Sequence, residues 1–242
     1  MAVQYRTKGF VFKKENVREA DQLFSVFTEN FGRVKILGRA VRKIKSKLRS
    51  GIDLFYFSEI EFIQGRSYKT LTDAVALNKF KNIRNDLNKL EIVQRIAEST
   101  DQLIKGEEKD ERIFNLLNES LDELCKNLNC ELLYYYFFWS LIFILGYQID
   151  LRSCVECKEK LVPNIMNFSA ESQGIICLKC SDDSIKDKIK ISPETVKILR
   201  IIQKEGWDYL KRLKVRDSYL EELNQISESY LKTLLQQIGC GK

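Results

Sequence analysis

The sequence predicts an α+β multidomain protein in which a small β-barrel precedes a larger, all-α helical domain. Three observations support this prediction. Short strand-like runs fill the first 80 residues, apolar residues recur with a helical period from about residue 80, and paired cysteines interrupt that period between residues 150 and 182. We therefore expect a barrel domain over 1–80, a helical domain over 81–150 and 183–242, and an inserted module over 151–182.

The composition narrows the class of protein. Hydrophobic residues make up 44% of the 242 and charged residues 31%, as in globular rather than disordered chains. The N-terminal residues 1–6 contain no apolar signal segment, so we expect a cytoplasmic protein with reduced thiols. The chain has no histidine and no GxxxxGK[ST] motif, so we expect no enzymatic activity.

Five strand-like runs predict the N-terminal barrel. A hairpin is indicated at Glu29–Gly32, between two β-prone runs. Five short strands with a basic surface are typical of the OB-fold, a five-stranded barrel that often binds nucleic acid. The predicted strands are 5–13, 23–28, 33–41, 54–63 and 67–77.

A basic segment lies within this barrel region. Residues 1–80 contain sixteen Lys or Arg against eight Asp or Glu, a balance of +8, whereas the whole chain carries +6. No acidic residue occurs between Asn30 and Ile52, and the later part of this segment reads as a loop at the barrel rim. We expect these cations to contact phosphates; the alternative is a merely solvated face. The eight predicted DNA-binding residues are Arg33, Lys35, Arg39, Arg42, Lys43, Lys45, Lys47 and Arg49.

Aromatic residues of the same region offer two interpretations. They could stack on unpaired bases, but we expect most of them to pack in the barrel. The residues concerned are Tyr5, Phe10, Phe12, Phe31 and Tyr56.

The helical region contains several amphipathic stripes. Ser192-Pro193-Glu194 predicts a helix start with an N-cap, a first-turn proline and an acidic first turn. A final helix is expected to end at Gly239. The stripes are Leu87, Leu90, Val93 and Ala97; Ile113, Leu117, Leu121, Leu124 and Leu128; and Leu220, Leu223, Tyr230, Leu231, Leu234 and Ile238.

An uncharged run of eighteen residues, 132–149, lies at the lower limit for a membrane span. Glu131 and Asp150 flank it directly, where a span usually has basic and interfacial anchors. We therefore predict the central helix of a globular bundle and no membrane association.

Two cysteine pairs predict a metal site. Cys154 and Cys157, and Cys177 and Cys180, form two CxxC motifs separated by nineteen residues, the spacing of paired zinc knuckles. Four thiolates complete a tetrahedral shell with no position open for water, so we expect one structural Zn²⁺. Unrelated buried thiols and a redox CxxC are the alternatives. Cys125, Cys130 and Cys240 stand apart and read as core or surface thiols.

Three stretches resemble the bacterial recombination mediator family RecO. The first covers residues 7–48, with Thr7-Lys8-Gly9 and the basic run Arg42–Leu48; the second covers 145–151 and runs into Cys154; the third covers 168–177. Two residues depart from the family pattern: Ala40 stands where glycine is frequent, and Ile44 where proline is frequent. The conformation of the rim loop is therefore expected to differ.

The resemblance implies a specific function, which the composition alone does not predict. RecO proteins bind single- and double-stranded DNA, anneal complementary strands, and with RecR help to load RecA onto gaps coated by single-stranded-DNA-binding protein, whose acidic C-terminal tail they bind. From the residues alone, three alternatives remain: a zinc-containing transcription or RNA-binding factor, a membrane-associated scaffold, and a metal-dependent nuclease with dispersed carboxylates.

Overall fold

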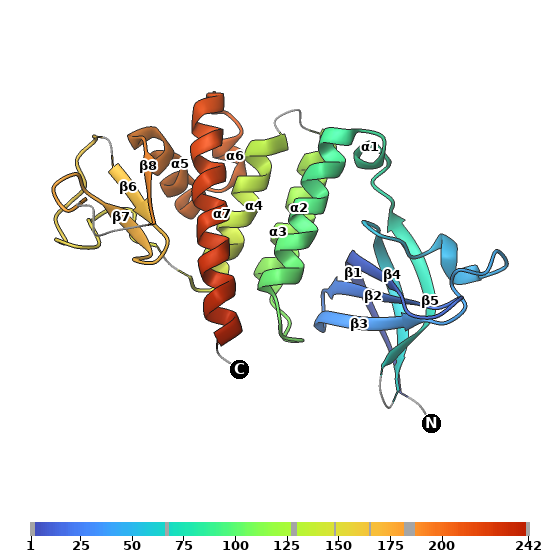
Figure 1. Ribbon diagram of the computed structural model, residues 1–242. Coiled ribbons are helices and arrows are strands. Elements are labelled where there is room, and N and C mark those ends of the chain that lie inside the picture. The colour runs from blue at the N-terminus through green and yellow to red at the C-terminus, as the bar shows by residue number, and fades with distance from the viewer. Residues whose placement is uncertain are drawn as a thin grey trace. The chain divides into compact units, whose positions relative to one another are not determined.

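The computed structural model describes residues 3–65, 68–126, 130–147, 149–164, 166–181 and 187–240. The chain forms two compact units, Met1–Leu128 and Asn129–Lys242. Figure 1 shows a group of strands followed by helices in the first unit, and helices with a small sheet in the second.

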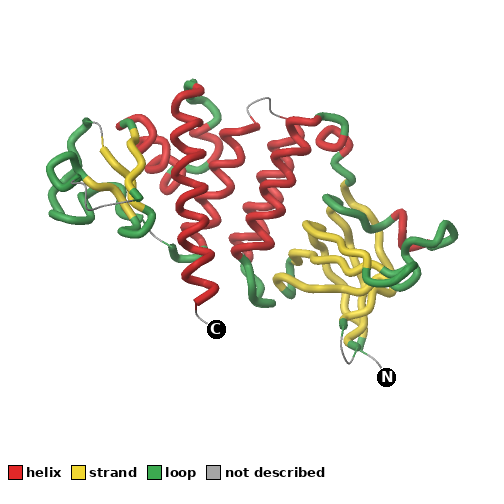
Figure 2. The backbone as a smooth tube through the Cα atoms, viewed as in Figure 1, coloured by secondary structure: helices red, strands yellow, loops and turns green. Residues whose placement is uncertain are grey.

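The first unit begins with a closed five-stranded barrel (Figures 1 and 2). The strands follow the order β1-β2-β3-β5-β4, and a short parallel pairing between β3 and β5 completes the closure. This arrangement confirms the predicted OB-fold barrel. Its strands are β1 (Gln4–Asn16), β2 (Gln22–Thr28), β3 (Gly32–Gly38), β4 (Phe57–Gln64) and β5 (Lys69–Asn78).

In the barrel strands, side chains that point into the core alternate with side chains that point outward. In β3, Val34 and Ile36 are fully buried, whereas Lys35 between them is exposed, because successive side chains of a strand point to opposite faces. The predicted hairpin at 29–32 is confirmed by the pairing of Thr28 with Gly32. The core consists of Val11, Phe24, Val26, Val34, Ile36, Val41, Ile52, Ile60, Phe62, Leu71 and Ala74.

Three helices complete the first unit: α1 (Lys81–Arg84), α2 (Leu87–Leu103) and α3 (Glu111–Lys126). Asp86 caps α2 by accepting hydrogen bonds from the N–H groups of Asn88 and Lys89. The predicted stripe of α2 is wrong at Leu87, which is 83% exposed. The buried face contains Lys89 instead, whose ammonium donates to the carbonyl of Cys125 at the end of α3. The predicted stripe of α3 is confirmed from Ile113 to Leu124, and Leu128 lies outside the described residues.

The uncharged run forms α4 (Cys130–Ile144), a buried helix of the second unit, as predicted. Trp139 is fully buried, stacks on Tyr230 with 5.4 Å between ring centroids, and donates to the hydroxyl of Ser227. Because neighbouring helices cover it on several sides, α4 needs no polar face. Among the described residues, no helix combines the length and apolarity needed to cross a bilayer.

Three further helices pack in the second unit: α5 (Pro193–Lys204), α6 (Trp207–Leu210) and α7 (Asp217–Cys240). Ser192 caps α5 as predicted, accepting a hydrogen bond from the N–H of Thr195. The predicted end of the last helix at Gly239 is wrong, because α7 continues to Cys240. Buried residues of α7 follow the helical period and extend the predicted stripe at Ile226.

A three-stranded sheet with the order β7-β6-β8 lies between α4 and α5 in the chain. Its strands are β6 (Met166–Ser169), β7 (Gly174–Ile176) and β8 (Lys188–Ile191). In the first unit, the last barrel strand ends at Asn78 and α1 begins at Lys81. The predicted limits at residues 1, 182, 183 and 242 lie outside the described residues, as does Ser67 of the fifth predicted strand.

Candidate nucleic-acid interface and metal centre

Most of the predicted DNA-binding cations lie on the segment that joins β3 to β4. We call residues 39–50 the basic loop; it ends in the short 3-10 helix η1 (Lys47–Ser50). Figure 1 shows this segment projecting from the barrel beyond the end of β3. Among the described residues, none of its cations forms an ion pair with a carboxylate, so their charge is available to a polyanion. The exposed cations are Arg39, Arg42, Lys43, Lys45, Lys47 and Arg49.

Apolar side chains anchor the basic loop to the barrel. Val41 and Ile52 are each 2% exposed and belong to the barrel core, and Leu48 packs against that core. Gly51 lies directly on β5, where an added Cβ would approach the carbonyl oxygen of Ala74 to 1.8 Å. The loop is therefore held at both ends and presents its charges on a fixed scaffold.

Polar contacts with residues 19–21 fix the start of the loop. The carboxylate of Asp21 accepts a hydrogen bond of 2.8 Å from the N–H of Ala40, and the guanidinium of Arg42 donates to the carbonyl of Glu19. Ala40 adopts a φ of 52°, in the left-handed region that favours glycine. Alanine thus occupies a glycine-type conformation here.

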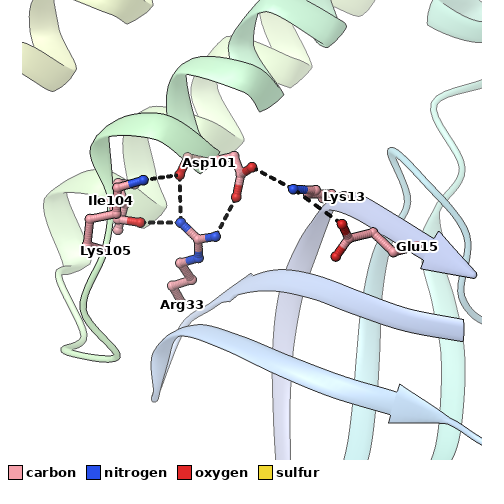
Figure 3. A network of polar contacts seen from close by, with 6 residues as sticks. All are labelled: Lys13, Glu15, Arg33, Asp101, Ile104 and Lys105. Carbon is pink, nitrogen blue, oxygen red and sulfur yellow. Dashed lines mark hydrogen bonds and ion pairs between the residues drawn. The ribbon is translucent and has the colours of Figure 1, made fainter. Parts of the chain in front are cut away.

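Arg33 does not belong to the exposed cations, and its assignment as a phosphate contact needs correction. Its side chain is only 12% exposed, and the guanidinium forms an ion pair with Asp101 of α2 and donates to the backbone carbonyls of Asp101 and Ile104 (Figure 3). It also lies 5.3 Å from the ring centroid of Phe12. These three hydrogen bonds are all directed to groups of the same unit, so Arg33 holds the barrel against α2.

The Arg33 contact is part of a larger network. Lys13 of β1 donates to the second carboxylate oxygen of Asp101 at 3.0 Å and lies 3.6 Å from Glu15 (Figure 3). Burial tends to raise the pKa of Asp101, but the hydrogen bond from Lys13 and the charge of Arg33 outweigh it and lower the pKa. Asp101 therefore stays ionised and joins two strands to one helix.

Lys35 is exposed on β3 and remains a predicted phosphate contact. The aromatic residues behave mostly as core, as expected. Phe10 and Phe12 are buried, and Tyr5 packs edge-on against Phe31 at 5.4 Å. Tyr56 lies beneath the cations of Lys79 and Arg84, so one of its faces is covered.

The four predicted zinc ligands converge in the second unit. The sulfur atoms of Cys154, Cys157, Cys177 and Cys180 all lie within 4.8 Å of one another. Cys157 Sγ and Cys177 Sγ are 3.9 Å apart. Tetrahedral zinc with Zn–S bonds of about 2.3 Å requires sulfur atoms roughly 3.8 Å apart. Both the donor set and the spacing therefore fit one tetrahedral metal ion.

The backbone around the cysteines explains this convergence. The N–H of Cys154 donates to the carbonyl of Glu159 and the N–H of Lys158 donates back to Cys154, which closes the first knuckle. The second knuckle follows β7 directly and is closed by a bond from the N–H of Cys180 to the carbonyl of Cys177. Because the N–H of Val155 also bonds to Ile175 of β7, the two knuckles lie side by side.

The electrostatics of the cluster favour a cation. Burial raises the pKa of the Cys154 thiol, but N–H groups of Cys177, Cys157 and Glu156 outweigh this and bring its pKa down to about 7. The sulfur of Cys177, followed by that of Cys157, raises the pKa of Cys180 to about 12. One thiolate thus opposes ionisation of its neighbours, and a divalent cation would stabilise all four.

Two of the other cysteines, Cys125 and Cys130, do not belong to this cluster. Cys130 is buried in α4, and Cys125 is half-buried, where burial raises the pKa of its thiol. The side chain of Cys240 lies outside the described residues.

Sequence reasoning missed two carboxylates that hold residues of the predicted basic segment in place. Asp101 is the partner of Arg33, and Asp21 fixes the turn at Ala40. Asp21 offered no local signal, because the N–H that it binds lies 19 residues away in the sequence. Asp101 offered none, because it lies 68 residues from its partner.

Comparisons with known proteins cover nearly the whole chain. Residues 1–80 match the family model described as recombination protein O N terminal, and residues 84–239 match recombination protein O C terminal. DNA repair protein RecO of Dehalococcoides mccartyi is 32% identical, over 96% of this chain and 91% of that protein. The proteins of the same name from Acetivibrio thermocellus and Alkaliphilus metalliredigens are 29% and 28% identical; the matches cover 96% and 97% of this chain, and 92% and 95% of those proteins.

Proposed function

Because this chain belongs to the RecO family of DNA repair proteins, we propose that it is a non-enzymatic recombination mediator that binds single- and double-stranded DNA and anneals complementary strands. It would act in the cytoplasm, at the nucleoid. With RecR, it would help to load RecA onto gaps coated by single-stranded-DNA-binding protein, and it would bind the C-terminal tail of that coating protein.

The observation that supports this proposal most strongly is the basic loop. Six exposed cations lie within residues 39–49 on a segment held by Val41, Leu48 and Ile52. Phosphate recognition requires positive charges along a track without fixed spacing. Lys35 extends the track along β3, whereas Arg33 is excluded because it pairs with Asp101. Holding two strands in one positive field reduces their mutual repulsion, which favours annealing.

The proposed role of the metal is structural. Four sulfur ligands leave no position for water or substrate, so a zinc ion would join the two knuckles and contribute to folding. We propose the barrel domain 1–80, the helical domain 81–150 with 183–242, and the zinc module 151–182 as the functional division of the chain, with DNA contact assigned to the barrel.

Annealing of complementary oligonucleotides coated by single-stranded-DNA-binding protein tests the proposal. The variant Lys43→Glu, Lys45→Glu, Lys47→Glu reverses three exposed charges without touching the buried anchors. We expect it to lose most of the annealing rate. A charge-matched control, Lys197→Glu, Lys204→Glu, Lys232→Glu, changes exposed lysines of α5 and α7. Equal annealing by the loop variant and the wild type would reject the assignment, and binding without annealing by the wild type would favour a transcription or RNA-binding factor.

A further inference from the structure

Ile44 is the most exposed large apolar residue in the described part of the chain, with 90% of its surface accessible. It lies in the middle of the basic loop, between Lys43 and Lys45. Isolated exposed apolar residues are common on protein surfaces. This one is unusual because six cations lie within five residues of it in the sequence. In addition, the other apolar residues of the same segment are buried or partly buried.

The apolar residues of this segment recur at Val41, Ile44, Leu48 and Ile52. Val41 and Ile52 are buried in the barrel core, and Leu48 packs against it. Ile44 alone of these four points away from the barrel. The anchoring of the loop is therefore complete without Ile44, and folding gives no reason for an apolar side chain at this position.

The backbone explains the orientation of Ile44. The N–H of Ser46 donates to the carbonyl of Lys43 at 2.9 Å, which closes a turn with Ile44 and Lys45 at its two corners. A preceding turn is closed by the N–H of Lys43 on the carbonyl of Ala40. Two consecutive turns thus present Ile44 at the tip of the loop, with a lysine on each side.

A partner suited to this tip must offer negative charges and apolar surface at close spacing. Single-stranded DNA has both, since its phosphates alternate with bases whose faces are open to contact. In duplex DNA the base faces are covered by stacking, and an apolar side chain reaches them only by separating a base step. An anionic membrane is less suitable, because one isoleucine buries too little apolar surface to anchor a protein.

We infer that Ile44 is a base-contacting residue: its side chain packs against the faces of unpaired bases while the neighbouring lysines bind the flanking phosphates. This inference rests on the proposed DNA-binding function of the basic loop and adds a preference for single strands. It also assigns to Ile44 the contact with bases that the buried aromatic residues of the barrel cannot make.

Equilibrium binding to three fluorescent probes tests the inference: a short oligodeoxythymidine, a duplex of the same length, and an abasic strand with the same number of phosphates. We expect Ile44→Ser to bind oligodeoxythymidine about tenfold more weakly than wild type. Its affinities for the duplex and the abasic strand, and the salt dependence of each, should stay unchanged. Ile44→Leu should restore binding.

Leu87→Ser is the matched control, because Leu87 is 83% exposed in the same unit but lies outside the basic loop. It should bind all three probes like wild type. Equal affinity of Ile44→Ser and wild type for oligodeoxythymidine would overturn the inference, as would an equal loss on the abasic strand. Ile44-dependent binding to vesicles of anionic phospholipid, without any effect on oligodeoxythymidine, would assign the tip to a membrane and also overturn it.

The lysine variant separates the inference from the function on which it rests. If Lys43→Glu, Lys45→Glu, Lys47→Glu binds oligodeoxythymidine as well as wild type does, the basic loop is not the DNA-binding site. If that variant loses binding but Ile44→Ser does not, the loop binds phosphates alone and only the role of Ile44 is rejected.

Discussion

Arg33 and Asp101 lie 68 residues apart in the chain, and their side chains form a partly buried ion pair that joins β3 to α2. Arg33, which the sequence predicts to contact DNA, therefore stabilises the fold instead. The strand separates it from the basic loop, because five residue steps at about 3.3 Å each place Arg33 roughly 17 Å from Gly38 at the far end of β3.

We expect Arg33→Met to lower the free energy of unfolding by about 2 kcal/mol, because Asp101 and two backbone carbonyls lose their donor. Urea denaturation measures this. Lys35→Met is the control, since Lys35 lies on the same strand but is exposed. A loss no larger than that of the control would show that the ion pair contributes little.

The same pair predicts a dependence of stability on pH. The folded-state pKa of Asp101 lies below its ordinary value near 3.8. Its contribution to stability is therefore complete above that value and is lost as the pH falls through the lowered pKa. Asp101→Asn should be less stable than wild type at neutral pH, and the difference should shrink in acid. Denaturation at a series of pH values tests this, and a constant difference would contradict it.

Cys157→Ser should remove the metal. Cys157 is exposed, so replacing it by serine changes the packing of the protein very little. Without a metal bound by the four thiols, the variant would therefore be about as stable as wild type. We expect about one zinc per chain in wild type, less than about half an equivalent in the variant, and a melting temperature lower by about 5 °C or more. Elemental analysis and thermal denaturation measure the two quantities. Cys125→Ser, outside the cluster, should retain the metal, and an equal zinc content in Cys157→Ser would exclude the proposed site.

The basic loop predicts a change in salt dependence. In Lys43→Ala, Lys45→Ala, Lys47→Ala, three phosphate contacts would disappear, and the slope of log K against log salt for single-stranded DNA should become shallower by about 2. Titrations at several salt concentrations measure this slope. Lys197→Ala, Lys204→Ala, Lys232→Ala should keep the wild-type slope, and a shared change in both variants would point to net charge rather than to the loop.

Ala40 predicts a stabilising substitution. Its φ of 52° is unfavourable for alanine by about 1 kcal/mol, so Ala40→Gly should raise the free energy of unfolding by up to about that amount. Ala97→Gly, inside α2, should have the opposite effect because glycine is unfavourable in a helix. Destabilisation by Ala40→Gly would show that the turn does not constrain this residue.

Local patterns predicted most of the fold. Alternation in β3, the helical stripe of α3 and the cap at Ser192 each depend on neighbouring residues, and each is confirmed. Two predictions about single residues were wrong. Leu87 fits the helical period but is 83% exposed, and α7 continues through Gly239, where a glycine commonly marks a helix end.

In the candidate sites, too, the features that depend on neighbouring residues could be predicted from the sequence. The cysteine spacing sufficed to identify four residues whose sulfurs converge, because a knuckle is a local structure. The basic loop was also visible as a run of charge. The separate roles of Arg33 and Ile44 were not, since one depends on a helix 68 residues away and the other on the direction in which a turn projects its corner.

The β2–β3 hairpin meets the segment between α2 and α3 so closely that a Cβ on Gly32 would lie 2.2 Å from the carbonyl oxygen of Glu108. Together with the ion pair of Lys69 and Glu107, this contact makes the barrel depend on residues well beyond its last strand. The barrel is therefore not a portable module. A fragment ending at residue 80 would lose these contacts and leave Arg33 without its carboxylate, whereas one ending at residue 128 keeps them, and the longer fragment is the natural unit for grafting or isolated study.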